Sequence, residues 1–215
     1  MKKRVRFSWL SVIAVLVLVV LLGIIAGCGS GGGQKSTEKP ASKTETTQKA
    51  DTSSSESSKV KTYKAGQYKV GADIPAGEYV VLSKDDGYVE VASDSSGKFE
   101  SIVVNDIFTN RSIITVSDGQ YLKVQNGTIY AVADAPKVEP KDGVLPSGMY
   151  QIGKDLPAGE YKVVAKRDGS YIEVSASSRH TLGDIISNDL FSGEQYITVQ
   201  DGQYLKLFGA ELKVQ

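Results

Sequence analysis

The most constraining feature of this chain is a segment of about seventy residues that occurs twice. Residues 70–79 (VGADIPAGEY) return as 152–161 (IGKDLPAGEY), 105–108 (NDIF) as 188–191 (NDLF), and 115–123 (TVSDGQYLK) as 198–206 (TVQDGQYLK). The offset between matched residues changes from 82 to 83 between residues 79 and 88, so one additional residue is expected in a hairpin loop, at 165–170 in the second copy against 83–87 in the first. The chain is therefore a duplicated unit, and an account of its fold or function has to consider both copies.

Within each copy the apolar residues recur with a period of two, which is typical of strands that are half buried. Residues 88–93 (YVEVAS) alternate in this way, and 114–116 (ITV) and 121–124 (YLKV) are rich in strand-forming residues. Turn sequences fall between these runs, among them DG at 118–119 and NG at 126–127. The pattern predicts an all-β protein: two tandem small β-sandwich or barrel-like modules, each of six or seven short strands, after a disordered tether.

Composition and repeat boundaries predict five segments along the chain. Residues 29–59 are dominated by Gly, Ser, Thr, Lys and Glu and contain no aromatic residue, so they cannot bury enough apolar surface to fold. The predicted layout is a signal peptide at 1–27, a disordered tether at 28–60, a first module at 61–134, a linker at 135–144 and a second module at 145–215.

The N-terminal residues have the pattern of a secretory signal. Four basic residues within residues 2–6 precede an apolar run at 9–26, and the run ends in Ile25-Ala26-Gly27-Cys28. These last four residues resemble the lipobox of bacterial lipoproteins, although the family prefers Leu where this chain has Ile25. The resemblance implies cleavage just before Cys28 and a diacyl lipid on its thiol. It predicts a lipid-anchored protein on the extracytoplasmic face of the cell membrane, with Cys28 as the lipidation site.

An uncleaved membrane helix is the alternative reading of the same residues. The run of about eighteen residues is at the short end of the roughly 17–25 that a spanning helix needs. Both readings give the same topology, because the basic residues stay inside and the rest of the chain faces out. Two acyl chains would hold the protein firmly, whereas one holds only marginally.

The charge distribution argues against a nucleic-acid partner. Four of the 25 basic residues and none of the 25 acidic ones precede Gly29, so the remainder carries about four net negative charges. Nucleic-acid binding requires clustered Lys and Arg, and no such cluster follows the signal. Cys28 is the only cysteine, so no disulfide can form within the chain.

The repeat also resembles a known family. The phrase Tyr-x-Val-Gly-x-Asp-Ile-Pro-Ala-Gly-Glu-Tyr at 68–79, with the later NDIF and DGQYLK motifs, is similar to a repeat found in secreted and lipid-anchored proteins of Gram-positive-type bacteria. The resemblance covers both modules. It implies a cell-envelope location and a β fold, and it brings no activity with it.

Asn105 and Asp106, with their counterparts Asn188 and Asp189, are the candidate binding residues. Each pair interrupts an apolar run, and buried polar groups must find hydrogen-bond partners. The favoured interpretation is structural: the side chains are expected to be buried in a turn and to bond backbone groups of neighbouring strands. A ligand site is the alternative.

Other repeated polar residues have structural explanations. Asp73 and Asp155 are expected to bond backbone amides two residues ahead in the Pro-Ala-Gly turn. The Asp-Gly pairs at 118–119 and 201–202, and Asn-Gly at 126–127, are expected to form hairpin turns. Glu90 and Glu173 are expected on a solvated strand face, and His180 in an exposed loop.

The sequence gives little support for catalysis. No nucleophile-elbow or zinc-protease motif occurs, no cysteine remains beyond Cys28, and residues 94–97 (DSSG) lack the calcium-loop pattern. We therefore predict no catalytic residues, no metal and no cofactor. The favoured function is a non-catalytic binding module at the bacterial envelope, with a cell-wall or extracellular protein partner. The alternatives are an envelope hydrolase or enzyme accessory using the repeated carboxylates, and a purely structural spacer.

Overall fold

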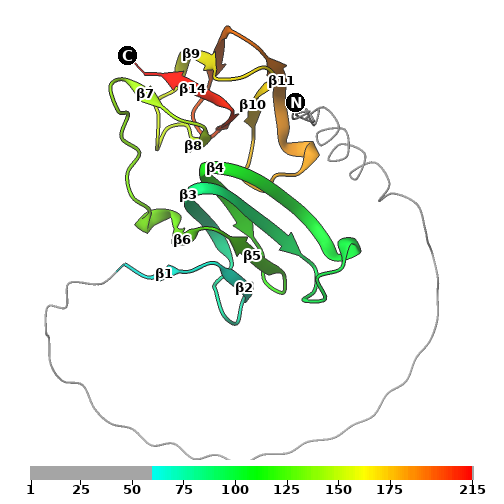
Figure 1. Ribbon diagram of the computed structural model, residues 1–215. Coiled ribbons are helices and arrows are strands. Elements are labelled where there is room, and N and C mark those ends of the chain that lie inside the picture. Colours follow the sequence, from blue (N-terminus) through cyan, green and yellow to red (C-terminus); the bar gives the residue numbers. More distant parts are fainter. Residues whose placement is uncertain (1–59, 215) are drawn as a thin grey trace, which may run out of the picture. The chain divides into compact units, whose positions relative to one another are not determined.

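The computed structural model describes residues 60–214, and these form an all-β protein, as the sequence predicts (Figure 1). The six strands of the first copy are β1 (Thr62–Tyr63), β2 (Gly66–Lys69), β3 (Gly77–Ala92), β4 (Ile102–Val116), β5 (Tyr121–Gln125) and β6 (Thr128–Ala131). The signal, the lipidation site Cys28 and the tether were predicted for residues that lie outside this described range.

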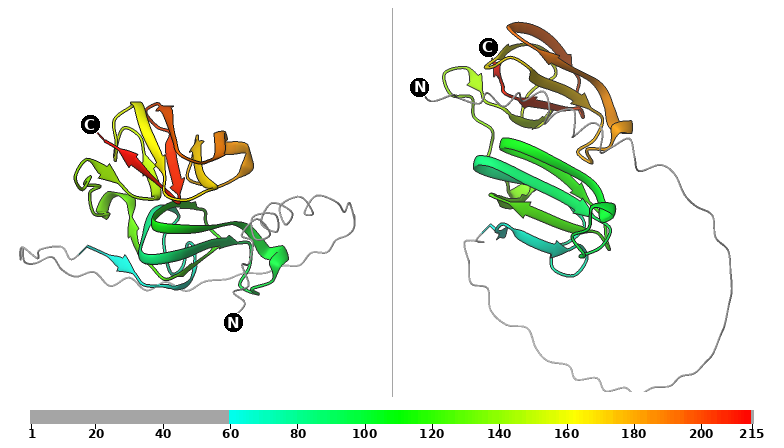
Figure 2. Two further views of the ribbon diagram at one scale, coloured as in Figure 1. Left: turned by 45° about the horizontal axis from the view of Figure 1, so that its top comes forward. Right: turned by 45° about the vertical axis from the view of Figure 1, so that its right-hand side comes forward.

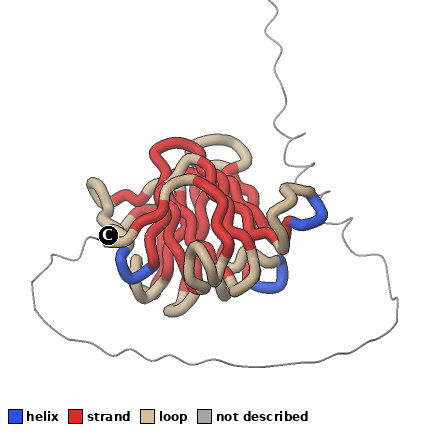
Figure 3. The backbone as a smooth tube through the Cα atoms, turned by 90° about the horizontal axis from the view of Figure 1, so that it is seen from below, coloured by secondary structure: helices blue, strands red, loops and turns tan. Residues whose placement is uncertain are grey.

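The second copy contains eight strands. They are β7 (Val144–Leu145), β8 (Gly148–Gln151), β9 (Gly159–Ala165), β10 (Ser170–Ser175), β11 (Ile185–Phe191), β12 (Glu194–Val199), β13 (Tyr204–Phe208) and β14 (Ala210–Lys213). Three short 3-10 turns complete the described secondary structure: η1 (Phe99–Ser101), η2 (Val132–Asp134) and η3 (Leu182–Asp184). Figure 3 shows strands through the body of residues 60–214, with these turns at its periphery.

The two copies share one arrangement of strands. In the first copy, β3 pairs with β4 along its whole length, while its first half also pairs with β6 and its second half with β5. In the second copy β3 is represented by β9 and β10, and β4 by β11 and β12. Together with β7, β8, β13 and β14 these strands form two four-stranded antiparallel sheets, in the orders β11-β10-β13-β8 and β12-β9-β14-β7. The first copy is therefore the same fold with its two sheets joined through long strands (Figure 2).

The difference between long and divided strands has a local cause. The first copy passes the corner with a register shift between Leu82 and Asp86 and with Asn110 at a φ of 65°. The second copy has Gly193 at the position of Asn110, with a φ of 77°, and one additional residue between β9 and β10. The extra residue thus lies where the sequence comparison placed it, between residues 83–87 and 165–170. The connection is a corner between sheets, however, and the expected hairpin loop is wrong.

Several turns predicted as hairpins are also corners. Asn126-Gly127 connects β5 to β6, which both pair with β3 and not with each other. Asp118-Gly119 connects β4 to β5, which do not pair with each other either. Asn126 adopts a φ of 55°, which asparagine tolerates in turns, but the local sequence does not show whether the two strands joined by the turn pair with each other. The prediction of short strands is wrong for β3 and β4, which run through their corner, and it is confirmed for the other strands of residues 60–214.

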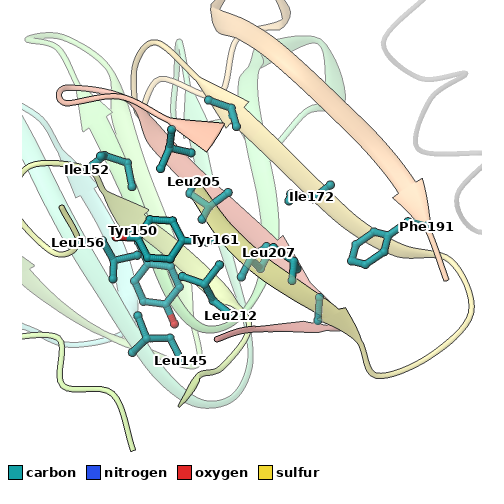
Figure 4. Close-up of a cluster of buried hydrophobic side chains, with 14 residues drawn as sticks. Leu145, Tyr150, Ile152, Leu156, Tyr161, Ile172, Phe191, Leu205, Leu207 and Leu212 are labelled. Carbon is teal, nitrogen blue, oxygen red and sulfur yellow. The ribbon is translucent and has the colours of Figure 1, made fainter. Parts of the chain in front are cut away.

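Each copy has its own apolar core. In the first, Val89, Val91 and Phe108 pack with Ile114 and Leu122. In the second, the inward residues of both sheets form the cluster in Figure 4, including Leu145, Tyr150, Ile172, Leu205 and Leu212. Each fully buried Val, Leu or Ile contributes about 1.5–3 kcal/mol, so two such cores offset much of the cost of ordering small modules.

The Pro-Ala-Gly turn is built identically in both copies. Tyr79 donates its hydroxyl to the Pro75 carbonyl oxygen at 2.6 Å, and Tyr161 does the same to Pro157 at 2.7 Å. Asp73 accepts a hydrogen bond from the Lys69 amide at 2.8 Å. The aspartate therefore fixes the strand before the turn, so the expected bond to amides two residues ahead is wrong. Asp155 accepts from the Gln151 amide in the same manner, at 2.9 Å.

The two copies also pack on each other through a third apolar cluster. Val80 and Ile113 of the first copy contact Met149 and Tyr204 of the second, all of them buried. A module of about seventy residues can be stabilised by its own core or by packing against a neighbour, and this structure uses both. The second copy makes this contact with β8 and β13, on the outward face of its β11-β10-β13-β8 sheet.

Candidate functional site

The four candidate residues have three different environments, which the sequence alone did not separate. Asn105 and Asn188 lie exposed on the outward face of β4 and β11. Each donates its side-chain amide to a tyrosine hydroxyl, Asn105 to Tyr88 at 3.4 Å and Asn188 to Tyr171 at 3.3 Å. The expected burial and backbone bonding are wrong for both asparagines, because the residues that face the core are their neighbours along the strand.

Asp106 is buried, as expected, but its partners are side chains. It is 6% exposed, accepts from Ser112 Oγ at 3.1 Å, and receives Lys206 Nζ from the second copy at 2.5 Å. Burial alone would raise the pKa of Asp106, but the Lys206 ammonium, followed by His180 and Ser112, holds it below the ordinary aspartate value. Asp106 therefore carries a negative charge at neutral pH and anchors the second copy on the first.

Asp189 is exposed, and its side chain has no ion pair or hydrogen bond to other residues within 60–214. The expectation that it is buried and structural is wrong. It occupies the strand position of Asp106, yet among residues 60–214 none covers it in the way that the second copy covers Asp106. The sequence could not separate the two, since both motifs read Asn-Asp before an apolar residue and Phe.

The repeated glutamates were also misplaced. Glu90 and Glu173 are buried, not solvated, and each accepts a short hydrogen bond of 2.5 Å from the tyrosine two residues before it. Burial, together with this bond to Glu90, raises the pKa of Tyr88 to about 12. Lys123 stands beside Glu90 at 3.8 Å on the next strand. Both carboxylates are therefore engaged by a tyrosine of their own strand, and Glu90 also by Lys123 of the neighbouring strand.

His180 is a further residue that sequence reasoning placed wrongly. Its side chain is only 5% exposed, and Nε2 lies 2.8 Å from the Ile113 carbonyl oxygen of the first copy. That geometry requires a proton on Nε2, which leaves Nδ1 facing Asp106 at 3.8 Å. Burial lowers the pKa of His180, and the neighbouring Asp106 only partly opposes this effect. The imidazole is neutral at pH 7 and belongs to the contact between the copies.

Polar groups surround the apolar contact between the copies. Arg111 pairs with Asp155 at 3.0 Å, and both side chains are nearly inaccessible. At the other end, Glu78 accepts from Ser178 at 2.5 Å and from Tyr204 at 2.6 Å. None of these pairings could be derived from the sequence, because the partners are 44 to 126 residues apart.

A set of exposed apolar side chains occurs at matching positions of the two copies. Among residues 60–214, six of the eight large apolar side chains that are most exposed form three matched pairs, and their exposed fractions run from 47% to 67%. The pairs are Phe99 with Leu182, Val103 with Ile186, and Ile107 with Leu190. We name these six residues the repeated apolar positions. The sequence contained a sign of these exposed positions, because apolar residues occupy both the inward-facing and the outward-facing positions of the same strand.

Four of the repeated apolar positions lie at free sheet edges, and the other two, Phe99 and Leu182, lie in the turns η1 and η3 just before those strands. Within residues 60–214 the first half of β4 pairs only with β3, and β11 pairs only with β10. Val103, Asn105 and Ile107 face outward together on β4, as do Ile186, Asn188 and Leu190 on β11. An edge strand has backbone donors and acceptors without strand partners, so each edge combines apolar side chains with free backbone groups.

Two shallow hollows lie next to these edges. One, of about 130 Å³, lies between β11 and β12 and is lined by Asp189, Gln195 and Ile197 together with Ile172 and Val174. The other, of about 400 Å³, lies on the first copy and is lined by Tyr88, Ile107, Lys123 and Asn126, among others. Neither hollow contains two facing carboxylates with a nucleophile between them.

The described residues show no metal site and no membrane-spanning segment. Within residues 60–214 no three His, Cys, Asp or Glu side chains gather closely enough to hold a metal ion. In the same range no helix is long and apolar enough to cross a membrane. Comparison with family models and with curated protein sequences gave no match for this chain.

Proposed function

We propose that this protein is a non-catalytic interaction module of the bacterial cell surface that binds extended polypeptide segments along its two free edges. The observation that carries the proposal is the set of repeated apolar positions, which are exposed in both copies. Exposed apolar side chains cost solubility, and an unrelated pair of surfaces would not place them at the same three positions. Four of the six lie on edge strands, which fits a ligand that adds as a further strand.

The proposed address is a lipid anchor on Cys28, at the outer face of the cell membrane. It is supported by the signal pattern and by the lipobox resemblance of residues 25–28. A partner there would be an extracellular or cell-wall-associated protein. Two edges in one chain give two binding events, so an extended partner with two suitable segments would gain avidity.

The alternatives are less well supported. A hydrolase using the repeated carboxylates would need them accessible, whereas Glu90 and Glu173 are buried against tyrosines and Asp106 is paired with Lys206. A passive spacer would have no reason to keep large apolar side chains exposed at both edges. Binding therefore accounts for the largest number of the observed features.

The proposal is tested by selecting unstructured peptides that bind the full chain in detergent micelles, and by measuring their affinity by fluorescence anisotropy. Val103→Asp and Ile186→Asp should each weaken binding at their own edge, and the double variant should weaken it more than tenfold. Lys84→Asp, an exposed change outside the edges, is the control. Equal affinity for the wild type and the double variant would reject the proposed edges.

A further inference from the structure

The contact between the copies shows what the Asn-Asp edge can accept. In the first copy Asp106 lies beside Ser112, close to the point where the two halves of β4 meet. Lys206 enters this place from the second copy with its Nζ at 2.5 Å from Asp106 Oδ1. The carboxylate is shared: one oxygen receives the ammonium and the other receives the Ser112 hydroxyl. The chain thus contains an occupied lysine site at this position.

The same position in the second copy is an open hollow. Asp189 corresponds to Asp106 and Gln195 to Ser112, and both line the hollow of about 130 Å³ between β11 and β12. Gln195 Nε2 is a buried donor without a hydrogen-bond partner within residues 60–214. A buried donor left unpaired is costly, so an arrangement that turns the Asp189 carboxylate toward it is favourable. In that arrangement Asp189 would be shared between Gln195 and an ammonium, as Asp106 is shared.

The remaining walls suit the stem of a lysine. Ile172, Val174 and Ile197 give the hollow an apolar lining, against which a chain of methylene groups can pack while its charged end reaches the carboxylate. A metal ion is a poor fit, because no cluster of three ligating side chains occurs in the described part of the chain. With one Asp189 oxygen engaged by Gln195, a single oxygen is left for the ligand, which suits a compact ammonium better than a guanidinium, whose fork binds both oxygens of a carboxylate.

A second copy of this chain is a poor candidate for supplying that lysine. Lys123 is the counterpart of Lys206, but its docking would bring Asp73 against Glu194, where Asp155 meets Arg111 in the internal contact. The apolar centre would be lost as well, since Gln67 and Lys162 stand in the places of Met149 and Val80. These differences oppose head-to-tail assembly and point to a partner of another sequence.

We propose that the hollow between β11 and β12 binds the side-chain ammonium of a lysine in a polypeptide partner, with Asp189 as its counter-ion. The inference rests on the proposed function, because the lysine belongs to a segment lying along the β11 edge. It adds a chemical preference at that edge: a lysine whose neighbours contact Ile186 and Leu190. The edge of the first copy has no such preference, since Asp106 is already paired with Lys206.

The test compares two acetylated, amidated pentapeptides, Thr-Val-Lys-Val-Thr and its analogue with norleucine in place of lysine. Their binding to the full chain in detergent micelles is followed by the ¹⁵N shift of the Gln195 side-chain amide. Wild type should prefer the lysine peptide by about tenfold. Asp189→Asn should abolish that preference, whereas Asp168→Asn, the same charge change at an exposed loop position, should preserve it.

The outcomes separate the two proposals. Equal binding of both peptides, unchanged by Asp189→Asn but lost in Ile186→Asp, would overturn the lysine site and leave edge binding in place. Failure of both peptides to shift Gln195 would also overturn the lysine site, while peptides selected at the first edge would still test the proposed function. A lysine preference that survives Asp189→Asn would likewise reject the assigned counter-ion.

Discussion

At the residue scale, Asp106 and Asp189 occupy matching positions but have different neighbours. Asp106 is buried with Lys206, whereas Asp189 is exposed beside an open hollow. Removing one partner of a buried ion pair leaves the other charge without compensation. The matched pair therefore separates a structural aspartate from one that is free to bind.

Asp106→Ala should lower the free energy of unfolding by about 3–5 kcal/mol, because Lys206 would remain in the contact without its counter-ion. Asp189→Ala should change it by no more than about 0.5 kcal/mol, as expected for an exposed side chain. Urea unfolding of both variants measures the difference. Equal destabilisation by the two changes would contradict the environments described above.

His180 should make stability depend on pH. Its folded-state pKa lies below the ordinary value of 6.5, so at acidic pH the unfolded chain takes up a proton that the folded chain does not. Stability is then fully present above about pH 6.5 and is lost as the pH falls toward the folded-state pKa, by at most about 1.4 kcal/mol per pH unit. Asp106, Lys206 and Glu173 are the charged groups that act on the imidazole.

The check is urea unfolding of the wild type and of His180→Gln between pH 7.5 and 5. Glutamine can still donate to the Ile113 carbonyl oxygen but does not titrate. We expect a flatter profile in the variant over this range. A wild-type profile as flat as that of the variant would show that His180 does not titrate as inferred.

At the scale of elements, the repeat shows how one strand pair can be continuous or divided. β3 and β4 pass the corner in one piece, and Gly87 lies there in close contact with the Phe108 ring. A β-carbon at Gly87 would stand 2.3 Å from Phe108 Cζ. The corresponding residue of the divided strands is Ser170, whose hydroxyl donates to the Gly209 carbonyl oxygen. The corner therefore tolerates a side chain only where the strands separate.

Gly87→Ser should lower the free energy of unfolding by about 1–3 kcal/mol, since the ring of Phe108 must move out of a packed core. Gly183→Ser is the control, because an added β-carbon there meets no atom within 4 Å. Thermal unfolding followed by circular dichroism compares the two. A neutral effect of Gly87→Ser would mean that the corner can open without loss of packing.

At the scale of the whole described unit, the contact between the copies joins two cores into one structure. The apolar centre formed by Val80, Ile113, Met149 and Tyr204 is bordered by the Arg111–Asp155 ion pair. On the second copy this contact uses β8 and β13, which lie at the far side of the β11-β10-β13-β8 sheet from β11, so Ile186 and Leu190 on the β11 edge remain exposed. Both proposed edges are therefore accessible while the two copies are packed together.

Arg111→Ala should lower the free energy of unfolding by about 3 kcal/mol, because Asp155 would keep a buried charge without its partner. Glu194, which occupies the matching position in the second copy, forms only a surface pair with Lys162. Glu194→Ala should therefore cost no more than about 0.5 kcal/mol. Tyrosine fluorescence reports the unfolding, since the single Trp of the chain is Trp9. A loss as small as that of the control would show the contact to be dispensable.

The sequence by itself determined the duplication, the all-β class and the place of the one-residue difference. These follow from local chemistry: period-two alternation, β-branched residues and turns that need Gly or Asn. It also pointed to Asn105, Asp106, Asn188 and Asp189 as residues of interest. It could not say which turns are corners, because Asn126 adopts the same backbone conformation whichever strands it connects.

Only the tertiary structure decided which copy of a repeated motif is buried. Asp106 and Asp189 have nearly identical local sequences, and their environments differ because Lys206 and His180 reach one of them across the contact between the copies. Burial of a charge depends on groups that are distant in the chain, and no local pattern records them. The exposure of apolar positions at both edges likewise depends on the tertiary structure, since a strand becomes an edge only when no strand pairs with its second side.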